Sequence, residues 1–283
     1  MKTLVTGVTG QLGFDVCTEL ERRGHEVVRA DRSRCDLSVP GSAAHFIETV
    51  RPDAVVHCAA FTAVDAAEDP PDLCRRVNAE ATAEIARACH DCRAKMLYVS
   101  TDYVFGGEGA APHTVNAQTR PLNVYGLTKL EGEQAVRRTL ERFFIVRTSW
   151  VFGLHGKNFV RTMLRLGQTR DEISVVDDQT GAPTYTADLA PLLCDMIESE
   201  RFGLYQAANE GFCSWAEFAA EIFSLARLPV RVRPISTAEY PTKARRPLNS
   251  RLDKSGLERA HFSRLPHWKD ALKRFLAASG QTL

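Results

Sequence analysis

A glycine-spaced segment near the start of the chain, TGVTGQLG from Thr6 to Gly13, limits the fold more than any other feature. It follows a short β-rich run and leads into Leu12–Arg22, whose apolar side chains recur at helical spacing. In such a strand–turn–helix unit Gly7 allows a sharp turn, Gly10 lets a pyrophosphate approach the backbone, and Gly13 lets the helix pack on the strand. The free N–H groups of the helix would face the phosphates. The segment therefore predicts a dinucleotide-binding site.

Four further β-rich runs follow at regular intervals, with helical patterns between them. Strands that alternate with helices favour a parallel sheet covered on both faces. We therefore predict an α/β fold, with a Rossmann-like doubly wound parallel sheet. The runs are 25–30, 54–59, 95–100 and 143–149.

After Trp150 the alternation becomes less regular. Helices are expected at about 158–168, 187–199, 215–228 and 268–278, and strands at 173–177 and 203–207. We predict two domains: residues 1–150 bind the dinucleotide, and residues 151–283 form a smaller C-terminal α/β domain that mainly binds substrate, with segments returning to the main sheet. The chain has no flexible linker, so a cleft between the two parts is the expected ligand site.

Composition narrows the range of partners. The chain has 36 Lys and Arg against 35 Asp and Glu, a formal charge of +1, which provides no general attraction for nucleic acid or an anionic membrane. No apolar run approaches the ~20 residues of a membrane helix, and the first strand begins at Lys2, so we expect a cytoplasmic protein. The eight scattered cysteines are expected to be reduced thiols, and Cys89–Cys92 lacks the second ligand pair of a zinc site.

The choice of nicotinamide cofactor depends on the end of the second strand. Asp31 lies 18 residues after the last glycine, where an acidic side chain holds the adenosine ribose hydroxyls and favours NAD. Arg32 and Arg34 follow at once, and a guanidinium there would hold a 2′-phosphate. Both cofactors stay open. Asp36–Leu37 is expected beside the adenine, and Ala59–Thr62 either along the cofactor or in ordinary strand-end packing.

Tyr125 and Lys129 are four residues apart and so lie on one face of a predicted helix. Thr101 ends the fourth strand, at the edge where doubly wound sheets bind ligands. Hydride transfer to a carbonyl produces an alkoxide that must be protonated. Tyr125 would donate that proton, Lys129 would lower the pKa of Tyr125, and the Thr101 hydroxyl would polarise the carbonyl. The three residues form a coherent predicted catalytic site.

Several longer segments carry a resemblance to a known family. They are HCAAFTAVDAAE, STDYVFGG, PLNVYGLTKLEGE, RTSWVFG, GKNF, DDQTGAPT and RRPLNS, together with the glycine-rich turn. With them the chain resembles the extended short-chain dehydrogenase/reductases and, among these, the dTDP-4-dehydrorhamnose reductases, over nearly its whole length.

The resemblance implies reduction of the C4 ketone of dTDP-4-dehydro-L-rhamnose to dTDP-L-rhamnose by NADPH or NADH, of which NADPH is the favoured one. It places Thr101, Tyr125 and Lys129 in the catalytic positions. It also implies substrate contacts at Thr101, Asp102, Tyr125 and Trp150. The cofactor contacts that the turn and the resemblance together imply are Gly7, Gly10, Gln11, Leu12, Gly13, Asp31, Asp36, Leu37, Ala60, Phe61, Thr62, Tyr125 and Lys129.

Other parts of the resemblance leave alternatives open. Lys157 and Asn158 either meet the diphosphate or cap the next helix. The basic run 230–251, with six cations and one acid, is either a diphosphate clamp or a solvated face. Some family members hold a divalent metal such as Mg at a dimer interface, and Asp15 falls where one ligand would be. Because its partners cannot be placed, no metal ligand is assigned and the chain is expected to be a monomer or a homodimer.

The rival functions that share this fold fall into two classes, nucleotide-sugar dehydratases or epimerases and a regulatory subunit. A nucleotide-sugar dehydratase needs a further acid beside the catalytic Thr, and here Asp102 is followed by Tyr103. An epimerase would retain its NAD and need no added reductant. A cofactor-binding regulatory subunit, similar to that of methionine adenosyltransferase, would keep Tyr125 and Lys129 without turnover, but the segments after Trp150 follow the reductase pattern.

Overall fold

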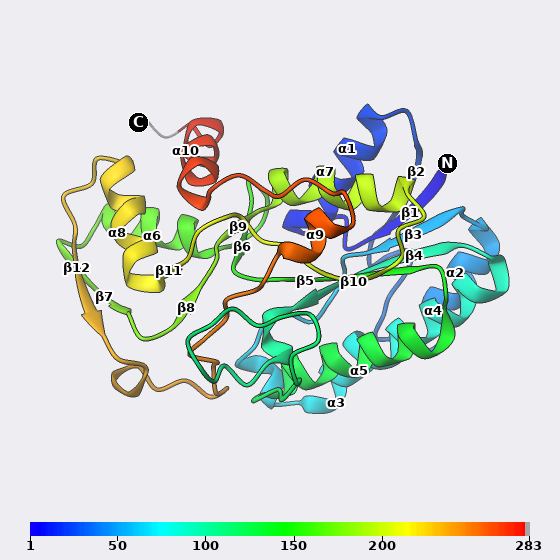
Figure 1. The fold of residues 1–283 in the computed structure, drawn as a ribbon, viewed down its shortest axis with the longest axis horizontal. Coiled ribbons are helices and arrows are strands. Elements are labelled where there is room, and N and C mark those ends of the chain that lie inside the picture. Colours follow the sequence, from blue (N-terminus) through cyan, green and yellow to red (C-terminus); the bar gives the residue numbers. More distant parts are fainter. Residues whose placement is uncertain (281–283) are drawn as a thin grey trace.

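A computed structural model describes residues 1–280. Its centre is a six-stranded, wholly parallel sheet in the order β10-β5-β4-β3-β1-β2 (Figure 1). This confirms the predicted Rossmann-like doubly wound fold. The strands are β1 (Lys2–Thr6), β2 (Glu26–Ala30), β3 (Ala54–His57), β4 (Lys95–Thr101), β5 (Phe143–Thr148) and β10 (Gly203–Gln206).

Helices cover both faces of the sheet because its strands carry apolar residues on both sides. One core contains Val5, Val56 and Val146, and the other contains Leu4, Val55 and Ile145. The first face packs against α1 (Gln11–Arg22), α7 (Thr186–Glu198) and α9 (Ser255–Arg259), and the second against α2 (Ser42–Val50), α4 (Ala81–Cys92) and α5 (Val124–Thr139).

The second half of the chain builds a separate hydrophobic core at one end of the molecule, on the left in Figure 1. Phe152, Phe218 and Phe275 lie at its centre. Its elements are β6 (Val151–Phe152), α6 (Phe159–Gly167), β7 (Glu172–Val176), β8 (Thr180–Gly181), β9 (Thr184–Tyr185), β11 (Cys213–Ser214), α8 (Trp215–Leu225), β12 (Arg231–Ile235) and α10 (Trp268–Ala278).

Part of the second half packs with the first. β10 pairs with β5 in the main sheet, and α7 belongs to the same core as α1. Residues after 150 thus complete one edge and one face of the Rossmann-like sheet. The division of the chain at residue 150 into cofactor and substrate domains stays a prediction.

Some elements differ from the expected ones. The helix expected between residues 65 and 92 consists of α3 (Pro71–Arg75), a π-helical turn (Arg76–Glu80) and α4. The helix α2 lies between the second and third β-rich runs, where a helical pattern was expected without stated bounds. The strand β12 was not predicted, and it lies inside the basic run 230–251. The strand β12 forms because it pairs with β7, a partner distant in the sequence.

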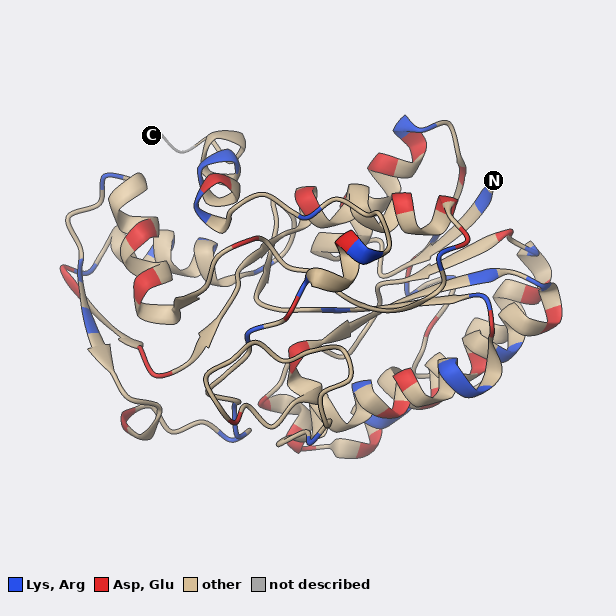
Figure 2. Ribbon diagram, viewed as in Figure 1, with Lys and Arg blue, Asp and Glu red and all other residues tan. Residues whose placement is uncertain are grey.

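Residues of both charge signs occur on helices α1, α5 and α10 (Figure 2), and over the whole chain the two signs nearly balance, with a formal charge of +1. Within residues 1–280 no helix combines the length and the apolar character needed to cross a bilayer.

Candidate active site

A cavity of about 800 Å³ opens at the carboxyl ends of the parallel strands. It lies where the strand order reverses between β1 and β3, the usual ligand position in a doubly wound sheet. The cavity brings together every residue predicted for cofactor, substrate and catalysis. They are Gly7, Gly10, Gln11, Leu12, Gly13, Asp31, Asp36, Leu37, Ala60, Phe61, Thr62, Thr101, Asp102, Tyr125, Lys129 and Trp150.

The glycine-rich turn joins β1 to α1 in a way that only glycine permits. Gly7 has a φ of +70°, and a Cβ there would lie 2.7 Å from the Ala59 nitrogen. A Cβ on Gly13 would lie 2.3 Å from the Gly7 carbonyl oxygen. No side chain caps α1 at Gly10 and its first turn carries no acid, so its N–H groups face the cavity unopposed. These features fit the pyrophosphate of a dinucleotide.

Asp31 follows β2 and stays on the cavity wall. Its carboxylate accepts hydrogen bonds from the Ser33 hydroxyl at 2.6 Å and from the backbone nitrogens of Ser33 and Arg34. The bond from the Ser33 hydroxyl is the main reason that the pKa of Asp31 is lowered. Arg32 also lines the cavity and donates to Asp36 at 3.1 Å, so acid and guanidinium sit side by side where the two cofactors differ.

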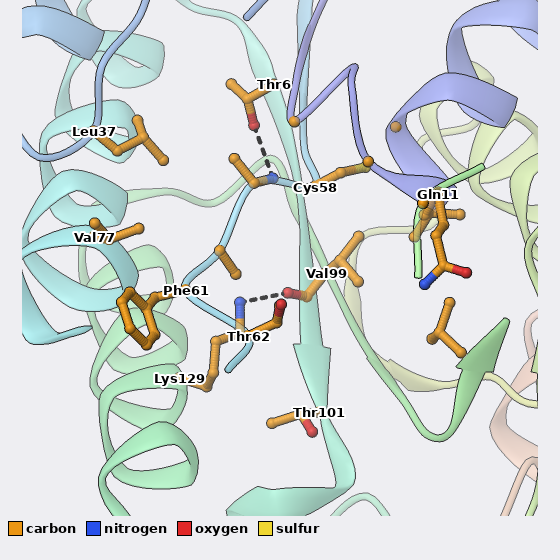
Figure 3. A pocket seen from close by; sticks show the side chains of 18 of the residues that line it. Thr6, Gln11, Leu37, Cys58, Phe61, Thr62, Val77, Val99, Thr101 and Lys129 are labelled. Atoms are coloured by element: carbon orange, nitrogen blue, oxygen red, sulfur yellow. Dashed lines mark hydrogen bonds between the residues drawn. The ribbon is translucent and has the colours of Figure 1, made fainter. Parts of the chain in front are cut away.

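Helix α5 aims Tyr125 and Lys129 into the cavity from the side opposite the glycine-rich turn. Lys129 Nζ donates to the Val99 carbonyl oxygen on β4 at 2.7 Å (Figure 3). The ammonium also lies 4.0 Å from the centre of the Tyr98 ring. Burial lowers the pKa of Lys129 to about 7.

Thr101, at the end of β4, lies between Asp102 and Tyr125. Its hydroxyl donates to Asp102 Oδ1 at 3.0 Å and accepts from the Tyr103 nitrogen. Burial raises the pKa of Asp102 to about 6 and also raises the pKa of Tyr125, which the Thr101 hydroxyl partly offsets. The expected lowering of the Tyr125 pKa by Lys129 is therefore not found, because burial dominates and the ammonium is directed at Val99.

An aromatic wall closes the cavity on the side of the second core. Trp150 has a φ of +49° and stacks on Trp215, with ring centres 3.7 Å apart. Both indoles line the cavity. Sequence reasoning missed Trp215, which begins α8 in a segment without a recognised motif, and only the stacking on Trp150 brings it to the site.

Asn78 is a second residue that sequence reasoning missed. It is fully buried in the π-helical turn, where the insertion of a residue often marks a functional site. Its amide accepts from the Phe61 nitrogen at 2.8 Å and donates to the Phe61 carbonyl at 3.1 Å. Asn78 thereby holds the segment after β3 that lines the cavity. The sequence around Asn78 has the spacing of a regular helix, so no sequence pattern indicates the π-helical turn or the role of Asn78 in it.

The GKNF segment connects the two halves beside the glycine-rich turn. Asn158 Nδ2 donates to Gln11 Oε1 at 2.8 Å, and Asn158 Oδ1 accepts from the Arg161 nitrogen and caps α6. Lys157 lines the cavity. The capping alternative thus applies to Asn158, while Lys157 faces the cavity, where its contact with the diphosphate stays a prediction.

The basic run does not supply a clamp inside the cavity, since none of its six cations is among the lining residues. Arg231 pairs with Glu172 on the surface of β7. Arg246 instead binds Asp65 through two bonds, at 2.7 and 3.1 Å, and faces Tyr103, so it ties the run to the cavity rim. The alternative that the basic run forms a face exposed to solvent applies to β12, where Arg231 and Arg233 are exposed.

Asp15 lies on α1 beside Thr186 and His155, and burial raises its pKa. Within residues 1–280 no three His, Cys, Asp or Glu side chains gather as a metal site. The metal considered for Asp15 stays unassigned.

The chain is similar in sequence to a known family and to several curated proteins. The family model described as the RmlD substrate binding domain matches residues 1–280. Among curated proteins, the chain is 41% identical to the dTDP-4-dehydrorhamnose reductase of Streptomyces griseus over 95% of this chain and 91% of the relative. It is 38% identical to the spore coat polysaccharide biosynthesis protein SpsK of Bacillus subtilis (strain 168), over 97% of this chain and 96% of the relative.

A solved structure gives the same result. The dTDP-4-dehydrorhamnose reductase of Bacillus anthracis str. Ames in complex with NADP superposes with a TM-score of 0.95 at 40% identity. The match covers 98% of this chain and 99% of that one. Fold and sequence similarity thus extend over both halves of the molecule.

Proposed function

This chain belongs to the RmlD substrate binding domain family, and from that membership we propose that it is an oxidoreductase that reduces dTDP-4-dehydro-L-rhamnose to dTDP-L-rhamnose with NADPH or NADH. The observation that carries the proposal is the single cavity shared by the dinucleotide turn, Thr101, Tyr125 and Lys129. The names of the full-length relatives and the NADP complex of the B. anthracis enzyme support the substrate and the cofactor.

The cofactor would be held along the carboxyl edge of the sheet. Its pyrophosphate would meet the N-terminus of α1, and its adenosine ribose would meet Asp31 and Arg32. When bound, the reduced nicotinamide supplies a hydride. Phe61, held by Asn78, would lie along it and exclude water on that side.

The protein's own groups would then handle the proton. Hydride arrival at C4 leaves an alkoxide, and Tyr125 would donate its phenolic proton to that oxygen. Its raised pKa keeps the phenol protonated at neutral pH, which is the form that a reduction requires. The Thr101 hydroxyl would turn from Asp102 to the same oxygen, and the Lys129 ammonium would stabilise the tyrosinate that results.

Features of the site favour a reductase over the rival activities. Tyr103 occupies the position where a dehydratase needs a second carboxylate, and its ring packs edge-on against Tyr125 at 5.6 Å. The basic run, through Arg246, and the GKNF segment, through Lys157, both reach the cavity region. The family model covers residues 1–280 and therefore includes both of these segments.

The first experiment measures oxidation of NADPH and of NADH, followed by absorbance, when purified protein meets freshly generated dTDP-4-dehydro-L-rhamnose. Formation of dTDP-L-rhamnose with consumption of one reduced cofactor per product would establish the reaction. Cofactor binding without oxidation would refute the proposal and favour the regulatory-subunit reading. Turnover with bound NAD and no added reductant would instead indicate an epimerase.

Lys129→Met is the companion variant. Loss of the ammonium is expected to weaken cofactor binding and turnover together, because one charge serves both. Lys273→Met, at an exposed position on α10, is the matched control. Equal cofactor affinity and equal turnover in the two variants would show that Lys129 has no role in cofactor binding or catalysis.

A further inference from the structure

A buried ion pair lies directly behind the catalytic lysine. Glu133 is on α5, one turn beyond Lys129, and is 1% exposed. Arg147 on β5 donates to both of its carboxylate oxygens, at 2.9 and 2.7 Å. Ser100 donates to the same carboxylate at 2.5 Å. Three strong bonds thus fix the orientation of one carboxylate inside the protein.

The spacing connects this pair to the cavity. Tyr125, Lys129 and Glu133 are each four residues apart, so they form one line along the inner face of α5. That line faces the end of β4, where three consecutive residues each lie next to one of these three side chains. Val99 accepts from Lys129, Ser100 donates to Glu133, and Thr101 lies beside Tyr125.

Lys129 needs such a neighbour because it is fully buried. Burial favours the neutral amine and lowers the pKa of Lys129, whereas the Glu133 carboxylate opposes this effect more than any other neighbour does. The remaining titratable groups around the ammonium are thiols, phenols and a buried imidazole, all of which are neutral at pH 7. They are Cys58 and His57 from the β3 side, Cys74 from α3, Tyr98 from β4 and Tyr125 from α5.

Arg147 provides a fixed positive partner for the Glu133 carboxylate. Its guanidinium is also held by the Val115 carbonyl at 3.2 Å and by the Phe105 ring at 5.0 Å. A guanidinium keeps its charge at any working pH, so the buried carboxylate of Glu133 always faces a positive partner. A pair that served packing alone would not need its acid placed one helical turn from a buried lysine.

We propose that Glu133 is a positioning residue for the reaction: its carboxylate, fixed by Arg147 and Ser100, keeps Lys129 in its ammonium form at the cavity wall. Glu133 itself touches neither cofactor nor substrate and acts through Lys129. The inference rests on the proposed function for its catalytic consequence, but its charge effect is measurable in the protein alone.

The direct test follows the titration of Lys129 by NMR in protein labelled at lysine ¹³Cε, without ligand. The spectrum of Lys129→Met identifies the signal. Glu133→Gln is expected to lower the midpoint of that titration by about one pH unit or more, the size typical of a lost opposite charge at close range. Glu133→Asp keeps the charge and is expected to restore most of the midpoint.

Glu131→Gln is the matched control, since Glu131 lies on the same helix but pairs with Arg75 at the surface. An unchanged midpoint in Glu133→Gln, or an equal change in Glu131→Gln, would overturn the proposal. If Glu133→Gln does not fold because Arg147 is left uncompensated, the double variant Glu133→Gln/Arg147→Gln removes both charges. It is expected to fold and to show a midpoint below that of the parent, with a smaller decrease than in Glu133→Gln because the opposing charge of Arg147 is removed as well. A parent-like midpoint in it would also overturn the proposal.

The second readout is the pH dependence of kcat for ketone reduction. Since the protonated lysine is the active form, its loss sets the basic limb. Glu133→Gln is expected to move that limb to lower pH with little change in the substrate KM. A protein that reduces no ketone would refute the proposed function, while the NMR titration would still decide the role of Glu133.

Discussion

Tyr125 illustrates how a single residue is prepared for its role by its surroundings. Its phenol is buried beside the Thr101 hydroxyl, and burial raises its pKa. Lys129 is nearby but is bonded to the Val99 carbonyl at 2.7 Å. In the proposed mechanism the two side chains therefore have separate roles, which the sequence analysis had joined: Tyr125 would supply the proton, and Lys129 would supply a positive charge.

Tyr125→Phe is expected to reduce kcat by about 10²- to 10⁴-fold while substrate affinity changes little, because the proton is needed only as the alkoxide forms. Steady-state kinetics with a direct binding measurement check this. Tyr240→Phe, at a 59% exposed position, is the control. Unchanged turnover in Tyr125→Phe would remove the phenol from the mechanism.

Asp31→Ala is expected to raise the ratio of NADPH to NADH efficiency. The carboxylate that accepts ribose hydroxyls and repels a 2′-phosphate would be gone, whereas Arg32 would remain at the cavity wall. The ratio of kcat/KM for the two cofactors on one preparation cancels differences in active fraction. A ratio equal to that of the parent would show that Asp31 does not reach the ribose.

At the scale of elements, the β1–α1 turn shows why the glycine spacing predicts so much. Gly7 and Gly13 are required by close backbone contacts and not by any side-chain chemistry. The π-helical turn around Asn78 is the contrasting case. Its Asn78 side chain makes two hydrogen bonds to the backbone of Phe61, and no local sequence pattern predicts these bonds.

Gly13→Ala is expected to abolish dinucleotide binding and to destabilise the fold by about 1 to 3 kcal/mol, since the new Cβ would overlap the Gly7 carbonyl. Thermal unfolding and cofactor titration measure the two effects. Gly256→Ala in α9 makes the same change where the nearest atom is 3.7 Å away, and a slight stabilisation is expected there. Normal binding in Gly13→Ala would contradict the assigned turn.

At the scale of the whole molecule, the chain's late segments complete the early site. Trp215 stacks on Trp150, Asn158 binds Gln11, and Arg246 binds Asp65. Each of these contacts joins residues more than sixty positions apart, so the cavity is a property of both halves together.

Asp65→Asn is expected to raise KM for the nucleotide sugar several-fold and to leave cofactor affinity unchanged. The lost charge releases Arg246, which faces Tyr103 at the cavity. Asp69→Asn is the control, because it breaks the neighbouring ion pair between Asp69 and Lys243. The two side chains are 79% and 53% exposed, respectively, so little change in KM is expected. Equal effects of both variants would show that the Arg246 contact does not shape the site.

His57 links the site to acid stability. Burial, aided by the Lys129 charge, lowers its pKa to about 3 from 6.5. Between these values the unfolded chain binds a proton that the folded one does not, so His57 reduces stability as pH falls below 6.5, by at most about 1.4 kcal/mol per unit. Asp102, with its pKa raised to about 6, acts in the opposite direction.

A comparison of the parent with His57→Gln therefore measures the contribution of His57 to the pH dependence of the unfolding free energy. Denaturant unfolding between pH 6.5 and pH 5 is expected to show a smaller acid loss of stability in the variant. Parallel pH dependences would mean that His57 is protonated in the folded protein.

The sequence by itself determined the parallel sheet and the dinucleotide turn and nominated Thr101, Tyr125 and Lys129 as the catalytic residues that we propose. The turn and the Tyr125–Lys129 pair were readable because they depend on local spacing: glycines for a turn, and a four-residue interval for one helix face. Every predicted site residue lies on one cavity, including those that only the family resemblance implied. Only the tertiary structure decided the partners of β12, the contribution of Trp215 and Asn78, and the direction in which the Tyr125 pKa moves. These depend on burial and on contacts between distant segments, which no local pattern encodes.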